Sequence, residues 1–344
     1  MEDYYELIYM ASRRYDQFFK ELSIEKMLTS QGKHGDKHFK IKLDEKAYSL
    51  RLIPYDRYTE EVFSFATDEV LKEQLKYCDY LVNVGIPFMK RIKIDGNNYF
   101  TKVSFNGEEW RCCMFEWIEG EHITCNTINT ATRIGEVARE MHDLSLKYSS
   151  NILPIINHTD AYMKWINDIF KIVNLMTSKK NKDLLLSYLN MAQKHINISN
   201  KFKSRPELKV ITTDLNSLNV LWNKNEKILG IVDHEHISYS DRIQDLAWLI
   251  KWYSRTEGIE SHQVSSTLAS SLLRGYKANN ILMGNDYERL SSLLWLSGCL
   301  NYNFVSKTLE ILRKCTTSEE LDEDLELHLF NYLKRGKDLL GLIK

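Results

Sequence analysis

The sequence is poor in residues that interrupt helices, and it has no excess of charge of either sign. Only 4 prolines and 14 glycines occur among 344 residues, so a helix-rich chain is expected. The 46 basic and 47 acidic side chains give a formal net charge of −1, which argues against nucleic-acid binding driven by bulk charge. The chain has no run of 18 or more apolar residues, so neither a transmembrane helix nor a membrane partner is expected.

The six cysteines lack the spacing of a zinc site or of a redox pair, because no two of them form a Cys-x-x-Cys motif. We expect them to be ordinary thiols in a reducing cytoplasm. Residues 1–17 start with acidic residues and lack the basic-then-apolar order of a signal peptide, which favours the same location. At about 150 residues per domain, the length predicts two domains or one domain with two lobes.

The N-terminal part, residues 1–118, has the pattern of a small α+β unit. Apolar residues recur at helical spacing in two of its segments and alternate with polar residues in others. The helices are expected at residues 2–28 and 59–84, and strands at 38–43, 48–53 and within 88–118.

The remainder, residues 119–344, is predicted to be a lobe of long amphipathic helices with one β-like insertion. The insertion, at residues 209–233, contains two short apolar strands separated by a polar turn. A hairpin bracketed by polar residues in a helical region is unusual, and we expect the chemistry to lie there. The helices are expected at about residues 128–148, 159–197, 261–279, 286–314 and 318–343.

Three residues of this insertion have the types and the spacing that phosphoryl transfer requires. Asp214 and Asn219 lie five residues apart in a polar loop, and Asp233 follows the hairpin. Phosphoryl transfer uses one carboxylate to orient the acceptor hydroxyl and receive its proton, and an amide and a second carboxylate to hold magnesium. The protein-kinase signature has the same separation between its aspartate and its asparagine. Asp and Asn are also common turn residues, so a purely structural role is the alternative.

The insertion resembles the catalytic loop of the aminoglycoside phosphotransferase and choline-kinase-like family. The family pattern H-G-D-x-x-x-x-N, followed by an apolar strand, a turn and I-x-D, is matched here by T-T-D-L-N-S-L-N and I-V-D. The resemblance implies a protein-kinase-like bilobal fold with a catalytic loop at residues 211–235. It also implies that Asp214 is the catalytic base and that Asn219 and Asp233 bind Mg²⁺.

The N-terminal part has segments that resemble the nucleotide site of the same family. The sequence Y-S-L-R at residues 48–51 stands where kinases have V-A-I-K, and strand alternation puts Ser49 and Arg51 on one face. The resemblance implies that Arg51 steadies the phosphates of ATP or GTP. Glu73 is the expected partner of Arg51, with Glu69 as the alternative.

A hinge between the two lobes is expected at residues 114–120, where the sequence M-F-E-W-I-E-G resembles the family's hinge. The resemblance implies that the backbone of Glu116 and Ile118 binds the purine base. Residues 234–236, with the sequence H-E-H, are expected to line the cleft rather than to form a metal site of their own. Glu235 is a candidate for a charge near the metal or for contact with a cationic substrate.

Two departures from the family pattern bear on activity. Thr212 and Thr213 replace the His-Gly pair before Asp214, and Arg51 replaces a lysine from which it differs in size, hydration and donor geometry. The first departure keeps open a catalytically silent kinase-fold protein that serves as a binding or structural component, such as a spore-coat protein. A protein kinase is disfavoured, because the sequence has no D-F-G motif, no A-P-E motif and no activation loop.

The sequence therefore predicts a Mg²⁺-dependent phosphotransferase that moves the γ-phosphate of ATP or GTP to a hydroxyl of a small molecule. The acceptor is not identified, because acceptor sites in this family are built from variable helices, here at about 159–200 and 255–344. No nucleic-acid partner is expected, and the sequence does not indicate an oligomeric state.

Overall fold

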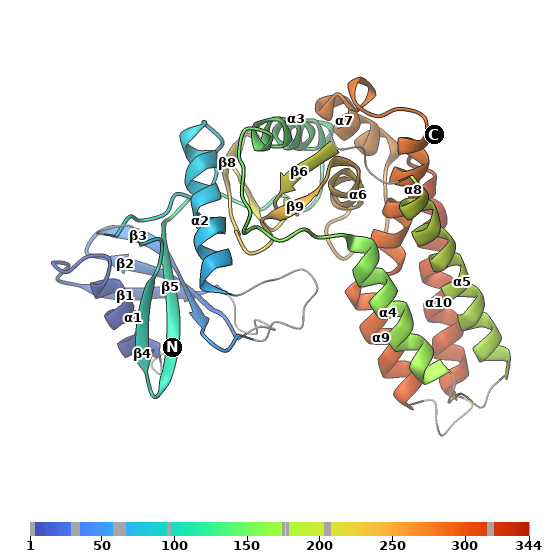
Figure 1. The fold of residues 1–344 in the computed structure, drawn as a ribbon, viewed down its shortest axis with the longest axis horizontal. Helices are drawn as coiled ribbons and strands as arrows, with labels where there is room; N and C mark the ends of the chain where they lie inside the picture. Colours follow the sequence, from blue (N-terminus) through green and yellow to red (C-terminus); the bar gives the residue numbers. More distant parts are fainter. Residues whose placement is uncertain are drawn as a thin grey trace. The chain divides into compact units, whose positions relative to one another are not determined.

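The computed structural model describes residues 4–28, 35–57, 67–94, 98–173, 176, 179–202, 208–314 and 320–343. The chain divides into two units, shown in Figure 1. The first unit contains an antiparallel sheet, and the second is predominantly helical, so the predicted α+β class is confirmed. The first unit consists of Met1–His122, Lys147–Pro154 and Thr213–Ser238, and the second of Ile123–Leu146, Ile155–Thr212 and Tyr239–Lys344.

The first unit is built on a five-stranded antiparallel sheet with the strand order β1-β2-β3-β5-β4. Two helices belong to this unit, α1 (Tyr5–Arg13) and α2 (Asp68–Asn83). The side chain of Thr67 caps α2 by accepting a hydrogen bond from the backbone of Val70. The strands are β1 (Leu22–Met27), β2 (Lys37–Leu43), β3 (Lys46–Pro54), β4 (Thr101–Phe105) and β5 (Glu108–Glu116).

The predicted helix over residues 2–28 is wrong beyond its first half. Helix α1 ends at Arg13, and the carboxylate of Asp16 accepts a hydrogen bond of 2.8 Å from the backbone of Phe18, a local turn that competes with helix. The chain then forms the edge strand β1, in which Ile24 pairs with Ile41 of β2. The alternation of exposed and half-buried residues in β1 is the signal that the helical interpretation overlooked.

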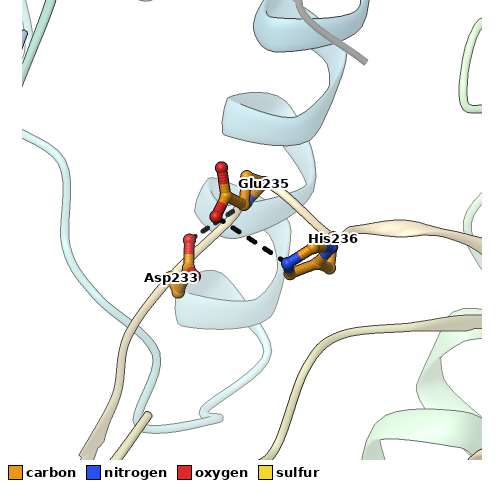
Figure 2. A group of neighbouring side chains, drawn as sticks. All are labelled: Asp233, Glu235 and His236. Atoms are coloured by element: carbon orange, nitrogen blue, oxygen red, sulfur yellow. Dashed lines mark hydrogen bonds and ion pairs between the residues drawn. The ribbon is translucent and has the colours of Figure 1, made fainter. Parts of the chain in front are cut away.

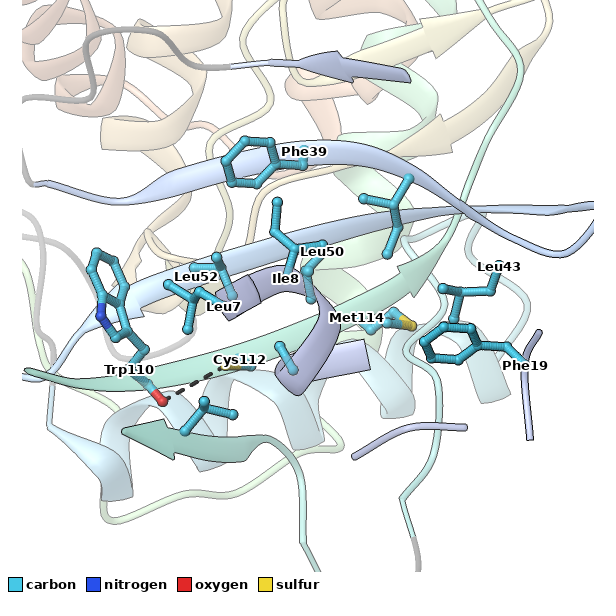
Figure 3. Packing of buried hydrophobic residues seen from close by; sticks show 13 residues of the cluster. Leu7, Ile8, Phe19, Phe39, Leu43, Leu50, Leu52, Trp110, Cys112 and Met114 are labelled. Atoms are coloured by element: carbon cyan, nitrogen blue, oxygen red, sulfur yellow. Dashed lines mark hydrogen bonds between the residues drawn. The ribbon is translucent and has the colours of Figure 1, made fainter. Parts of the chain in front are cut away.

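Helix α1 and the sheet enclose the hydrophobic core of the first unit, which Figure 3 shows from close by. Leu7 and Ile8 of α1 are fully buried and belong to the same cluster as residues of β2, β3 and β5. This packing stabilises the strand that carries Arg51, because the core residues alternate with it along β3. The strand residues of the cluster are Phe39, Ile41, Leu43, Leu50, Leu52, Val103, Trp110, Cys112 and Met114.

The predicted hairpin also belongs to the first unit and comprises β7 (Val220–Trp222) and β8 (Ile228–Ile231). Ile231 makes two backbone hydrogen bonds to residues 87–89: its N–H donates to Pro87 at 2.7 Å, and its carbonyl accepts from Met89 at 2.8 Å. Trp222 and Glu121 exchange two backbone hydrogen bonds of 2.9 Å. These bonds fix the hairpin to the segments that flank β5.

The second unit consists of helices and a short two-stranded sheet. Figure 1 shows α4, α5, α8, α9 and α10 running alongside one another. The helix predicted over 159–197 is two helices, and the one predicted over 286–314 is broken between Cys299 and Tyr302. The elements are α3 (Ile128–Ser145), α4 (His158–Val173), α5 (Lys179–Lys201), β6 (Lys209–Thr212), β9 (Ser238–Asp241), α6 (Arg242–Tyr253), α7 (Ser266–Tyr276), the 3₁₀ turn η3 (Ala278–Asn280), α8 (Asn285–Cys299), α9 (Tyr302–Lys314) and α10 (Glu320–Leu340).

The start of the predicted helix over 59–84 lies outside the described residues up to residue 66, as do residues 318–319 of the last predicted helix. None of the described helices combines the length and the apolar character that crossing a bilayer requires.

Candidate active site

The loop between β6 and β7 is held by hydrogen bonds among its own polar residues. Asn216 donates through Nδ2 to the carboxylate of Asp214 at 2.8 Å, and Asn219 donates through Nδ2 to the backbone carbonyl of Asp214 at 2.8 Å. The amide nitrogen of Asn219 makes this hydrogen bond, and its amide oxygen, Oδ1, does not take part in it. A hard cation would bind an amide through that oxygen.

Thr213 does not force the loop into an unusual backbone conformation. It is 6% exposed, and it is not among the described residues with a positive φ angle. A left-handed backbone is one reason for a glycine, and this reason does not apply at Thr213. Thr213 in place of glycine therefore does not strain the backbone just before Asp214.

Asp233 lies two residues after the end of β8, and its backbone has a φ angle of 74°. This left-handed conformation is uncommon for residues other than glycine, although Asp and Asn tolerate it best. The preceding residue, Val232, donates its N–H to the backbone carbonyl of Asn219 at 2.8 Å. This bond holds the backbone of Asn219 against the residue that precedes Asp233.

Arg51 of β3 gathers three carboxylates around its guanidinium group. It donates through Nη1 to Asp233 at 2.9 Å, through Nη2 to Glu235 at 2.7 Å, and through Nε and Nη2 to Asp36 at 3.0 and 2.7 Å. A second arginine, Arg57, pairs with Glu235 and lies 3.2 Å from Asp36. Three carboxylates therefore face two guanidinium groups, and this cluster keeps one negative charge.

Burial and the neighbouring charges both shift the pKa values of Glu235 and Arg51 in this cluster. Burial raises the pKa of Glu235, but the charges of Arg51, His236 and Arg57 outweigh it and hold the pKa well below its ordinary value. Burial lowers the pKa of Arg51, yet Glu235, Asp233 and Asp36 raise it well above its ordinary value. Glu235 and Arg51 are thus both charged.

The expected ion pair between Arg51 and Glu73 is wrong. Glu73 accepts hydrogen bonds from Lys76 at 2.9 Å and from the Tyr148 hydroxyl at 3.0 Å, while Glu69 is exposed. The next residue of α2, Gln74, instead reaches the segment that follows β8 and donates to the backbone carbonyl of Glu235 at 2.9 Å. One step along a helix turns the side chain by about 100°, which is why Gln74 faces the segment and Glu73 does not.

The predicted nucleotide contacts lie on β3 and just beyond β5. The hydroxyl of Ser49 is 2.5 Å from Nε2 of His38. Glu116 ends β5, and its carboxylate pairs with Lys90 at 2.6 Å. Ile118 packs on the hairpin, since a Cβ atom at Gly230 would come within 2.4 Å of its Cδ1 atom.

Asp233, Glu235 and His236 form a group that could hold a metal ion, with one potential ligand atom each and all three atoms within 4.8 Å of one another. Figure 2 shows Glu235 between the other two side chains. Magnesium prefers oxygen ligands, and Asn219, Asp233 and Glu235 supply amide and carboxylate oxygens that fit it. The expectation that residues 234–236 line the cleft stays a prediction; Glu235 and His236 belong to this group, whereas His234 is buried near the ring of Phe115.

Sequence reasoning missed Asp36 and Arg57 and gave Glu235 too little weight. Asp36 lies just before β2 and Arg57 just after β3, so both flank strands that were predicted. In the sequence each stands beside another charged residue, so neither can be told from an ordinary surface charge. Only the fold shows that Asp36 pairs with both Arg51 and Arg57.

Solved structures with the same fold include several small-molecule kinases. A microcompartment-associated aminopropanol kinase has 12% identity and a TM-score of 0.66, with 98% of this chain and 99% of that chain covered. The amicoumacin kinase hAmiN, solved with AMP-PNP, Ca²⁺ and Ami, has 12% identity and a TM-score of 0.64, with 98% and 93% covered. A choline kinase from Cryptosporidium parvum Iowa II has 14% identity and a TM-score of 0.55, with 98% of each chain covered.

At these identities the likeness establishes the fold, which is that of kinases. No curated protein matches the sequence. The family described as the phosphotransferase enzyme family, APH, matches residues 35–291, which include strands β2 to β5 of the sheet, the loop between β6 and β7 and most of the helical unit. The chain belongs to this phosphotransferase enzyme family.

Proposed function

We propose that the protein is a small-molecule kinase that transfers the γ-phosphate of ATP or GTP to a hydroxyl group with the help of Mg²⁺. The observation that carries the proposal is the meeting of Arg51 with Asp233 and Glu235, close to a loop that presents Asp214 and Asn219. The solved relatives named above as aminopropanol, amicoumacin and choline kinases support a small molecule as the acceptor.

In this proposal each residue has a distinct task. Asp214 aligns the acceptor hydroxyl and receives its proton, and Arg51 contacts the nucleotide phosphates. Asn219 and Asp233 hold the metal, and Glu235 keeps Arg51 in position. When bound, Mg²⁺ would neutralise the charge that develops on the phosphate oxygens.

The nucleotide is proposed to bind to the first unit. Ser49 and Arg51 share one face of β3, and the backbone of Glu116 and Ile118 would bind the purine base. Residues 1–118 thus remain the proposed nucleotide lobe, and residues 119–344 the proposed acceptor lobe. A reducing compartment such as the cytoplasm is in keeping with the free thiols of the described cysteines, Cys78, Cys112, Cys113, Cys125 and Cys299.

The alternative function is a catalytically silent kinase-fold protein. The ion pair between Arg51 and Asp233 is compatible with this function as well, because without a metal the guanidinium occupies the carboxylate that the metal would need. The two functions differ in whether magnesium and a nucleotide together can displace this pair.

Thermal unfolding with ATP and with GTP, each with and without Mg²⁺, tests the proposal. A ligand at about 100 times its dissociation constant adds about 2.7 kcal/mol to the free energy of unfolding. We expect a magnesium-dependent shift with one nucleotide and its loss in Asp233→Asn. Asn is a suitable replacement because it also tolerates the left-handed backbone of this position. A wild-type protein that shifts with neither nucleotide would favour the silent alternative.

A further inference from the structure

Among the described residues, two buried arginines of the second unit, Arg255 and Arg335, form no ion pair with a carboxylate. Each is only 6% exposed. Arg255 follows α6, donates through Nη1 to the backbone carbonyl of Ile259, and lies 4.6 Å from the ring centre of Trp252. In the part of the chain that the structure describes, Arg335 of α10 makes no hydrogen bond or ion pair, and it lies 5.9 Å from the ring centre of Tyr332.

This absence sets the pair apart from the other buried arginines of the described chain, each of which meets a carboxylate. A buried charge without a partner lowers the stability of the fold, so such groups are normally paired. The paired examples are Arg57 with Asp36 and Glu235, Arg91 with Asp79, Arg111 with Asp68, Arg242 with Asp143, and Arg289 with Asp241.

The segment after α6 joins the surroundings of the two arginines: Arg255 pairs with Val264 in an isolated β-bridge, and the ring of His262, two residues before Val264, lies beside Tyr332, which Arg335 also contacts. Burial and, to a smaller extent, the charge of Arg335 together lower the pKa of Arg255 to about 10, while exposed Glu260 acts against both effects. His262 lies 6.2 Å from the ring centre of Tyr332, and its pKa is lowered by burial and then by Arg335 and Arg255. Positive charge therefore accumulates here, and Glu260 offsets it only in part.

We propose that Arg255 and Arg335 form a binding site for the carboxylate or phosphoryl group of a small molecule. Guanidinium groups bind such oxyanions with two parallel hydrogen bonds. The rings of Trp252 and Tyr332, on which the guanidinium groups lie, limit the freedom of both side chains before the anion arrives. The site adds to the proposed kinase function and does not depend on it.

The proposal makes a prediction about stability that a purely structural role does not make. Without an anion, the unpaired charge of Arg335 destabilises the fold, so Arg335→Met, which keeps an apolar stem, should raise the unfolding temperature. With the anion bound, wild type should have the higher unfolding temperature of the two. If Arg335 served only to stabilise the helices, the substitution would lower the unfolding temperature in every buffer.

The test is thermal unfolding of the full chain in sodium chloride, sodium phosphate and sodium malonate at equal ionic strength. Wild type should gain several degrees in phosphate or malonate over chloride, and Arg335→Met and Arg255→Met should lose most of this gain. Arg133→Met is the control, because Arg133 is exposed and pairs with Glu136 on the surface of α3. It should behave like wild type.

Phosphate could also bind at Arg51, so the unfolding temperature of every variant is also measured with MgATP, which is proposed to bind there. The increase that MgATP causes in wild type should persist in Arg335→Met, because this substitution leaves Arg51 unchanged. The proposal is overturned if Arg335→Met keeps the full gain from both anions, or if it unfolds earlier than wild type in chloride. Because these outcomes do not involve turnover, they remain readable if the kinase proposal fails.

A turnover assay then assigns the anion to its source, using hydroxy acids and the corresponding hydroxy amides as acceptors. If wild type prefers the acids by more than tenfold and Arg335→Met loses this preference, the anion belongs to the acceptor. If turnover does not depend on the carboxylate while anion binding persists, the site serves a separate ligand. Either result supports the site itself.

Discussion

Arg51 donates a hydrogen bond of 2.9 Å to Oδ1 of Asp233, and this single contact joins the predicted phosphate-binding residue to the predicted metal ligand. The same guanidinium also holds Asp36 and Glu235, so Arg51 supplies in this structure the positive charge that three carboxylates require. A divalent cation at Asp233 would compete with Arg51 for the same oxygen. Arg51 would then be free to turn toward the phosphates of an incoming nucleotide.

Arg51→Gln tests this exchange of charge. Removing the guanidinium leaves Asp36, Asp233 and Glu235 with Arg57 alone, and breaking a buried ion pair costs about 3–5 kcal/mol. We expect a large loss in the free energy of unfolding by urea, and a partial recovery with Mg²⁺ in the absence of nucleotide. Wild type should show little effect of Mg²⁺ alone.

Arg51→Lys is the matched variant, since it keeps the charge but loses the forked geometry. It should lose less stability than Arg51→Gln and respond less to Mg²⁺. Equal stability of Arg51→Gln and wild type would contradict the view that Arg51 holds the cluster together.

The sequence could predict the parts of this site that are close together along the chain. The spacing of Asp214, Asn219 and Asp233 and the hairpin between them is local information, and the structure has that loop and that hairpin. The partners of Arg51 could not be predicted, because Asp36 and Glu235 are 15 and 184 residues away from it and meet it only through the fold. The choice between Glu73 and Gln74 depends on the rotation of α2, which periodicity alone does not determine.

Asp214→Asn should bind nucleotide as wild type does and lose nearly all turnover. The amide keeps the size and one acceptor oxygen, so the contact with Asn216 can persist, but it cannot accept the hydroxyl proton. General-base catalysis contributes about 10²–10⁴-fold, which sets the expected loss in kcat. Steady-state kinetics and a nucleotide-binding isotherm on the same preparation provide the measurement.

Asn225→Ala provides the control for that variant, because Asn225 is exposed in the turn between β7 and β8. Its kcat should match that of wild type. Turnover in Asp214→Asn within a factor of a few of wild type would exclude Asp214 as the base.

Two histidines of the first unit, half-buried His38 and buried His234, should make the free energy of unfolding fall between about pH 6.5 and pH 4. Burial, with the charge of Arg51, lowers the pKa of His38 to about 4 and that of His234 to about 3. In the unfolded chain a histidine has a pKa of about 6.5, so below this pH the unfolded state binds more protons and stability is lost as the pH falls. The slope is about 1.4 kcal/mol per pH unit for each such histidine.

Urea unfolding at half-unit steps of pH from 4.5 to 7.5 measures this slope. His234→Gln should flatten it by about the contribution of one histidine, whereas His122→Gln, at an exposed position, should not. Glu235, whose pKa is held low by Arg51, adds a loss of the same sign only at lower pH, below the ordinary pKa of a glutamate. An unchanged slope in His234→Gln would show that this histidine titrates alike in both states.

Gly135→Ala should destabilise the second unit severely, because α3 and α7 cross with almost no space between their backbones. A Cβ atom at Gly135 would lie 2.2 Å from the carbonyl oxygen of Leu272, and one at Gly275 would lie 2.2 Å from that of Thr132. A backbone atom cannot swing aside as the end of a side chain can, so the helices must separate and lose buried contacts. Alanine is normally the better helix former, which by itself would stabilise the protein by about 1 kcal/mol.

The sign of the effect therefore decides between helix propensity and helix contact. We expect Gly135→Ala to lower the unfolding temperature by several degrees, and Gly275→Ala to do the same. Ser270→Ala, on an exposed position of α7, should leave it unchanged or raise it slightly. If Gly135→Ala were as stable as Ser270→Ala, the close crossing of α3 and α7 would not be present in solution.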